Sequence, residues 1–121
     1  MKVIKVEHEG TTPYLMSDSE QGSLRTEADV MDLIAAAWEH GMTRLMLQEE
    51  ALSDEFFDLR SGLAGIALQK FVNYQIRTAA VISNETAIRG RVKEMVTELN
   101  KGSHFRVFPS IADAEAWLLA D

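Results

Sequence analysis

A short polar cluster follows two phenylalanines in the middle of the chain. The stretch "FFDLRSGLAGIALQKFVNY", residues 56–74, brings Asp58, Arg60 and Ser61 together just before a predicted helix. A serine hydroxyl at a helix start commonly accepts a hydrogen bond from a free backbone N–H of the first turn. A phosphate on that hydroxyl would instead add about two negative charges at a helix N-terminus. The pattern therefore allows Ser61 to be either a helix cap or a phosphorylation switch.

Small and polar residues form a strip along this predicted helix, which runs from about Gly62 to Tyr74. At about 100° per residue the strip consists of Gly62, Gly65, Gln69 and Asn73. Glycines let another backbone or a ligand approach closely. The strip indicates tight helix–sheet packing with locally bonded amides, the floor of a pocket, or the face of a dimer.

Few other residues have a spacing typical of catalysis or metal binding. The three histidines, His8, His40 and His104, share no ligand spacing, and the chain has no cysteine. Asp58 and Arg60 could form an ion pair that braces the loop, but the sequence shows no nucleophile–base partner for them. "SGLAG" is not a phosphate-binding glycine motif. We therefore expect no metal, no cofactor and no catalytic constellation.

Composition limits the class of protein. The 121 residues, 46% of them hydrophobic, suit one globular domain that spans residues 1–121. The absence of cysteine excludes disulfides and thiolate chemistry. The start "MKVIKVEHEG" has no apolar stretch typical of a signal peptide, and no window suits a membrane span. A net charge of −7 argues against general nucleic-acid binding, so we expect a soluble cytoplasmic protein.

Strand and helix patterns alternate along the chain. The predicted strands are residues 3–7, 13–17, 43–48, 76–82 and 105–108, and the main predicted helices begin at 26, 62, 86 and 110, with a brief one after 53. Such alternation predicts an α/β fold with a mixed, mostly parallel sheet of four or five strands, about four helices and an antiparallel hairpin at one side.

Caps and apolar faces place these helices. Thr26, Ser53 and Ser110 are the predicted N-caps. The residues expected to face inward are Val30, Ile34, Ala37 and Trp38 in the first long helix, Ile88, Val92, Met95, Val96 and Leu99 in the third, and Ile111, Ala114, Trp117 and Leu118 in the last. The basic residues Arg89, Arg91, Lys93, Lys101 and Arg106 indicate either a solvated helix face or a site for an anion or an acidic partner.

The sequence of residues 52–82, "LSDEFFDLRSGLAGIALQKFVNYQIRTAAVI", resembles the core of the DUF4180 family of small bacterial proteins of unassigned function. The family line reads "FFDLRTGLAGEILQKFVNYRIRLA", so Ser61 stands where the family has threonine and Ile66 where it has glutamate. The order of elements is also similar to the STAS fold of SpoIIAA-like anti-sigma-factor antagonists. Those proteins carry a phosphorylatable hydroxyl before a glycine, and "DLRSGL" has Asp58, Ser61 and Gly62 in a similar order.

Two functions follow. The first is a non-catalytic regulatory or protein-interaction module of STAS type, with a surface at the loop 53–61 and a switch at Ser61. The second is a small-ligand-binding protein or enzyme, with a polar pocket near the strand ends. That pocket would be lined by Asp58, Arg60, Gln69 and Asn73. A protein partner or a homodimer fits the first reading, and neither reading involves a membrane or a nucleic acid.

Overall fold

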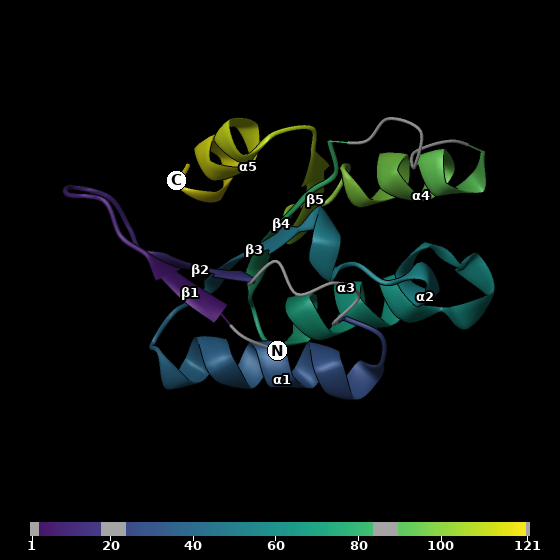
Figure 1. The fold of residues 1–121 in the computed structure, drawn as a ribbon, viewed down its shortest axis with the longest axis horizontal. Coiled ribbons are helices and arrows are strands. Elements are labelled where there is room, and N and C mark those ends of the chain that lie inside the picture. Colours follow the sequence, from purple (N-terminus) through teal and green to yellow (C-terminus); the bar gives the residue numbers. More distant parts are fainter. Residues whose placement is uncertain (1–2, 18–23, 84–89, 121) are drawn as a thin grey trace.

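A five-stranded sheet forms the centre of the protein. The computed structural model describes residues 3–17, 24–83 and 90–120. The strands follow one another across the sheet in chain order: β1 (Val3–Val6), β2 (Tyr14–Ser17), β3 (Arg44–Gln48), β4 (Arg77–Val81) and β5 (Phe105–Phe108). β1 and β2 pair antiparallel, and β2 to β5 pair parallel (Figure 1). The predicted mixed sheet with a hairpin at one side is confirmed.

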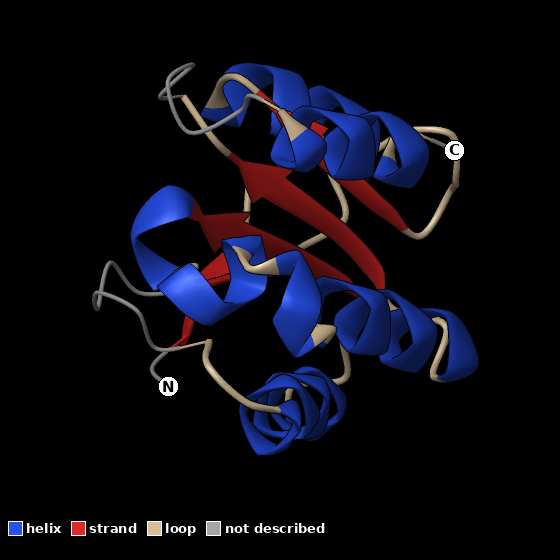
Figure 2. Ribbon diagram, turned by 90° about the vertical axis from the view of Figure 1, so that its right-hand side faces the viewer, coloured by secondary structure: helices blue, strands red, loops and turns tan. Residues whose placement is uncertain are grey.

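Helices cover both faces of this sheet. They are α1 (Glu27–Glu39), α2 (Asp54–Phe57), α3 (Leu63–Asn73), α4 (Arg91–Leu99) and α5 (Ile111–Leu118), with short 3₁₀ turns at Glu49–Ala51 and Leu59–Ser61. Crossovers of one hand between strands taken in order place their helices on the same side. α1, α3 and α4 accordingly share one face, and α5 packs on the other (Figures 1 and 2).

Each face has its own apolar core. The larger core joins the sheet to α1, α3 and α4 and includes the stacked rings of Phe56, Phe71 and Phe105. The smaller core lies under α5 and consists of Tyr14, Met46, Ala79, Val81, Ala114 and Leu118. Strands β3 and β4 contribute to both cores, which explains their nearly continuous apolar sequences.

The predicted helix starts are largely confirmed. The Thr26 hydroxyl accepts from the Asp29 backbone N–H, and the Asp29 carboxylate accepts from the Thr26 backbone, which completes a capping box on α1. The hydroxyl of Ser53 caps α2 and that of Ser110 caps α5. Local hydrogen bonds of this kind depend only on neighbouring residues, so they can be predicted from sequence.

Two residues predicted to face inward do not. Trp38 is 56% exposed and Ile111 is 47% exposed. Trp38 lies one position beyond the buried stripe that ends at Ala37, and its ring packs edge-on against Tyr74, 5.0 Å between centroids. Ile111 begins α5 just after β5 ends at Phe108, so it lies at the carboxyl end of the sheet and not over its face.

The third long helix is confirmed from Arg91 onward. Val96 and Leu99 are buried, and Val92 and Met95 pack against the larger core. The predicted beginning of this helix, including Ile88, lies outside the described residues.

Candidate functional site

The predicted polar cluster forms a tight turn between α2 and α3. The Asp58 carboxylate accepts a hydrogen bond from the backbone N–H of Arg60 at 3.0 Å and lies 3.4 Å from its Nε. The Arg60 side chain is 93% exposed and that of Asp58 is 44% exposed. Such an exposed pair contributes about 0–1 kcal/mol, so its main effect is to shape the turn.

The Ser61 hydroxyl bonds to the backbone of this turn. Its oxygen lies 2.5 Å from the carbonyl of Glu55 and 2.8 Å from that of Asp58, and it accepts from the N–H of Leu63 at 3.2 Å. The N-cap position of α3 falls on the next residue, Gly62, whose φ of 70° is left-handed. The prediction that Ser61 is the helix cap is therefore corrected by one position.

These contacts restrict what a phosphate on Ser61 could do. Phosphorylation replaces the hydroxyl hydrogen with a group whose oxygens only accept hydrogen bonds. Those oxygens would face the carbonyls of Glu55 and Asp58, which also only accept. A phosphorylated Ser61 side chain would have to move away from these two carbonyls, so the turn before α3 would open.

Gln69 and Asn73 lie apart from this turn. Both are exposed on the outer side of α3, in line with Gly62 and Gly65. Because a helix rises about 1.5 Å per residue, Asn73 lies roughly 15 Å along the axis from the start of α3. The predicted strip is real, but it faces solvent, and Asp58 and Arg60 sit at only one end of it.

An apolar groove runs between α3 and α4. It has a volume of about 290 Å³ and is lined by Gly62, Ala64, Gly65, Leu68, Met95, Glu98 and Leu99. A β-carbon built on Gly62 or Gly65 would meet no atom within 4 Å, so the missing side chains of these glycines leave the groove open. The groove begins next to Ser61, at the surface that the sequence singled out.

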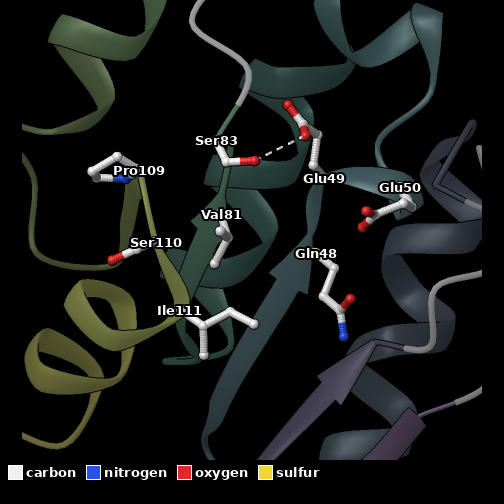
Figure 3. A pocket seen from close by; sticks show the side chains of 8 residues that line it. All are labelled: Gln48, Glu49, Glu50, Val81, Ser83, Pro109, Ser110 and Ile111. Carbon is white, nitrogen blue, oxygen red and sulfur yellow. Dashed lines mark hydrogen bonds between the residues drawn. The ribbon is translucent and has the colours of Figure 1, made fainter.

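A second pocket lies at the carboxyl ends of β3, β4 and β5 (Figure 3). It has a volume of about 290 Å³ and is lined by Gln48, Glu49, Glu50, Val81, Ser83, Pro109, Ser110 and Ile111. The Ser83 hydroxyl points toward the Glu49 carboxylate, 3.5 Å away (Figure 3). This carboxyl edge is the usual ligand side of a parallel sheet.

The sequence predicted a pocket near the strand ends lined by Asp58, Arg60, Gln69 and Asn73, and none of these four residues lines the pocket at the carboxyl edge. Gln48 ends β3, Ser83 follows β4 and Ser110 follows β5. A search for polar residues directly after each apolar strand would have found them, because parallel strands end at one edge.

The opposite edge of the sheet holds a polar cluster that the sequence did not reveal. The Tyr14 hydroxyl donates to a carboxylate oxygen of Glu115 at 2.5 Å, and the same oxygen lies 3.3 Å from Nε2 of His8. Burial, the hydrogen bond to Glu115 and its negative charge raise the pKa of Tyr14 well above its usual range. Tyr14 and Glu115 are 101 positions apart, so no local pattern could predict their contact.

The described residues contain no group of three or more histidine, aspartate or glutamate side chains placed to hold a metal ion. Nor does any helix in the described ranges have the length and apolar content needed to cross a bilayer.

Fold and sites together define an α/β domain with a mostly parallel five-stranded sheet, an apolar groove on one face and a pocket at the carboxyl edge of the sheet. Residues 9–118 match the family described as domain of unknown function (DUF4180). The chain therefore belongs to the DUF4180 family, as its sequence resemblance predicted. No characterised protein and no solved structure gave a significant match to the chain.

Proposed function

We propose that the protein is a non-catalytic regulatory module of STAS type that acts in the bacterial cytoplasm by binding another protein. The observation that carries this proposal is the groove between α3 and α4, which opens beside Ser61. The element order, with a β-hairpin and then strands and helices in strict alternation, supports the likeness to STAS domains. The hydrogen bonds of Ser61 close the turn at the start of α3, and the groove begins directly beside this turn.

The groove indicates the chemistry of its partner. Its floor is apolar, with Ala64, Leu68, Met95 and Leu99, and Glu98, which forms an exposed ion pair with Lys101 at 3.0 Å, lies at its side. Glu94, one turn earlier on α4, adds a second exposed carboxylate. In a chain with a net charge of −7, these features favour a partner segment that inserts an apolar side chain and carries lysine or arginine beside it.

The turn at Ser61 gives this module a means of regulation. The Ser61 hydroxyl accepts a hydrogen bond from the backbone N–H of Leu63, and Gly62, which lies between them in the chain, lines the groove. A phosphate on Ser61 would open the turn, because its oxygens would face the carbonyls of Glu55 and Asp58, and would thereby change the entrance to the groove. In this proposal the switch acts through the shape of the turn as well as through charge.

The test uses a substitution that fills the groove without straining the backbone. Tagged wild-type protein, Gly65→Leu and Gln69→Leu are expressed in the cells of origin, and the proteins that copurify are quantified by mass spectrometry. Gly65 has open space for a side chain, and leucine is a good helix former. Gln69→Leu places the same side chain one turn further along the exposed strip, outside the groove.

A partner that is retained by wild type and Gln69→Leu but lost from Gly65→Leu supports the proposal. Its affinity should also fall for Glu98→Lys, because that change reverses a charge at the groove. Equal recovery of every copurifying protein with Gly65→Leu would overturn it.

A second candidate function is small-ligand binding in the pocket at the carboxyl edge. The observation that favours it is the convergence of Gln48, Glu49, Ser83 and Ser110 at the ends of three parallel strands. These groups suit a ligand with amino and hydroxyl groups, and Val81 and Ile111 would contact its apolar part. A ligand bound in this pocket would place the small-ligand site at the carboxyl edge of the sheet, and not at the predicted residues Asp58, Arg60, Gln69 and Asn73.

A thermal-shift screen of metabolites with amino and hydroxyl groups tests this candidate. We expect at least one compound to raise the Tm of wild type and to lose that effect in Ile111→Trp, which fills the pocket from an exposed position. A screen without a hit, or a hit unaffected by Ile111→Trp, would count against it.

A further inference from the structure

Three arginines lie side by side on the α5 face of the sheet. Arg44 opens β3 and Arg77 opens β4, and the two are register partners. Arg106 on β5 is paired with Ala79, which lies two residues beyond Arg77. Because side chains alternate between the faces of a strand, all three arginines point to the same side.

The indole of Trp117 on α5 contacts two of them. The Arg77 guanidinium carbon lies 4.1 Å from the ring centroid and that of Arg106 lies 5.5 Å from it. Arg77 also donates to the carbonyl oxygens of Trp117 and Ala120 at the end of α5. Arg106 donates from Nε to the carbonyl of Gly102 at 2.7 Å. These contacts fix the position of Arg77 and Arg106.

The three positive charges lack an acidic partner in the part of the chain that the structure describes. None of Arg44, Arg77 and Arg106 forms an ion pair with a described carboxylate. Glu115, on the same helix as Trp117, instead bonds Tyr14 and His8. Burial, and then the charges of Arg44 and Arg106, lower the pKa of Arg77. Placing three like charges together is costly unless an anion offsets them.

Two donor atoms in this cluster also have no partner among the described residues. Arg44 Nη1 and Arg77 Nε are buried and make no hydrogen bond within residues 3–17, 24–83 and 90–120. Leaving a buried charged donor unsatisfied costs several times the net value of a typical hydrogen bond. As whole residues all three arginines are only partly buried, so parts of the row other than these two nitrogens face solvent.

We propose that Arg44, Arg77 and Arg106 form a binding site for the phosphate group of a small molecule. A phosphate monoester carries up to two negative charges and three acceptor oxygens, enough to engage more than one guanidinium. A single carboxylate offers one charge and is filled by one bidentate arginine. The site lies on the face opposite the α3–α4 groove, so it is independent of the proposed protein interface.

The test titrates inorganic phosphate at constant ionic strength and follows the fluorescence of Trp117. The chain has two tryptophans, so the experiment is done in a Trp38→Phe background. The proposal predicts a saturable change in emission, and at least a roughly 10-fold weaker affinity for Arg44→Gln, which removes a charge-assisted donor. Arg44 Nη1 has no acceptor among the described residues, so this variant breaks no hydrogen bond of that nitrogen, and circular dichroism checks that it folds.

Lys101→Gln is the matched control, because it removes one positive charge from an exposed position outside the cluster. Its phosphate affinity should equal that of the parent protein. Equal weakening by Lys101→Gln and Arg44→Gln, or no saturable phosphate signal, would overturn the site. Tighter binding of malonate than of phosphate would overturn the phosphate assignment.

Asp121→Asn addresses the carboxylate that follows Ala120 in the sequence. If Asp121→Asn changes the emission of Trp117 without phosphate, and phosphate itself has no effect, the arginines pair with the Asp121 carboxylate and the proposal is wrong. Unchanged phosphate affinity in Asp121→Asn, together with the loss in Arg44→Gln, supports it.

Discussion

The Ser61 hydroxyl joins three backbone groups in the turn before α3. We predict that Ser61→Ala lowers the free energy of unfolding by about 1 kcal/mol, because Leu63 N–H loses its side-chain acceptor and the carbonyls of Glu55 and Asp58 each lose one of their donors. Ser61→Asp should cost more, since its carboxylate would face the carbonyls of Glu55 and Asp58. Urea unfolding at unchanged m-value measures both effects.

Ser103→Ala is the control for this pair of variants. Ser103 is exposed, and its hydroxyl lies 3.5 Å from the ring of His104, at the limit of a hydrogen bond. Its removal should leave stability unchanged. A Ser61→Asp protein as stable as wild type would show that a negative charge fits the closed turn, and would contradict the proposed opening on phosphorylation.

Tyr14 should make stability depend on alkaline pH. Its folded-state pKa is raised by burial and by the hydrogen bond to Glu115. The native protein therefore keeps the phenol protonated where the unfolded chain begins to lose the proton, above about pH 10. The stabilising contribution is complete below that pH and is lost as the pH rises toward the folded-state pKa.

Comparison with Tyr14→Phe measures this contribution. At pH 7 we expect the variant to be less stable by about 1.5 kcal/mol, because it lacks a hydrogen bond to a carboxylate. The difference in unfolding free energy between the two proteins should shrink from pH 9 to pH 11. A difference that stays constant over this range would contradict the raised pKa.

At the scale of the element, two glycines of one helix should respond in opposite directions. Gly62 has a left-handed φ of 70°, whereas Gly65 lies inside α3. Gly62→Ala should destabilise the protein by about 1–2 kcal/mol. Gly65→Ala should stabilise it by about 0.5 kcal/mol, because alanine loses less backbone entropy in a helix.

Space around the glycines cannot explain this difference, since neither added β-carbon would meet another atom within 4 Å. Thermal unfolding of the two single variants therefore isolates the effect of the backbone. Changes of the same sign in both proteins would contradict the assigned helix start at Gly62.

The elements could be predicted where their signals are local. Caps such as Thr26 and Ser110 and the alternating apolar strands indicated nearly every helix and strand that the structure describes. The predicted inward position of Trp38 was wrong, because a helical wheel does not show how wide the covered stripe is. That width depends on α3, which packs beside α1, and on Tyr74 at its end.

On the scale of the whole molecule, function depends on contacts between distant segments. The groove joins α3 to α4, and the contact of Tyr14 with Glu115 joins the second strand to the last helix. The arginine row left a sequence signal: "TRLMLQ", "IRTAAVI" and "FRVF" each have an arginine near the start. The signal could be used only once the strands were known to lie next to one another in parallel.

Self-association also belongs to this scale and stays a prediction. β1 is an edge strand with Ile4 52% exposed, and an unpaired edge can add a strand from a second copy. Dimers through β1 would leave the α3–α4 groove free, because the groove lies on other elements.

Hydrogen–deuterium exchange of the purified complex tests whether a partner protein binds in the α3–α4 groove. We predict slower exchange on binding in residues 61–69 and 91–101, with exchange in β1 and α5 unchanged. Slower exchange confined to β1, to α5 or to the pocket at the carboxyl edge would place the interface elsewhere and contradict it.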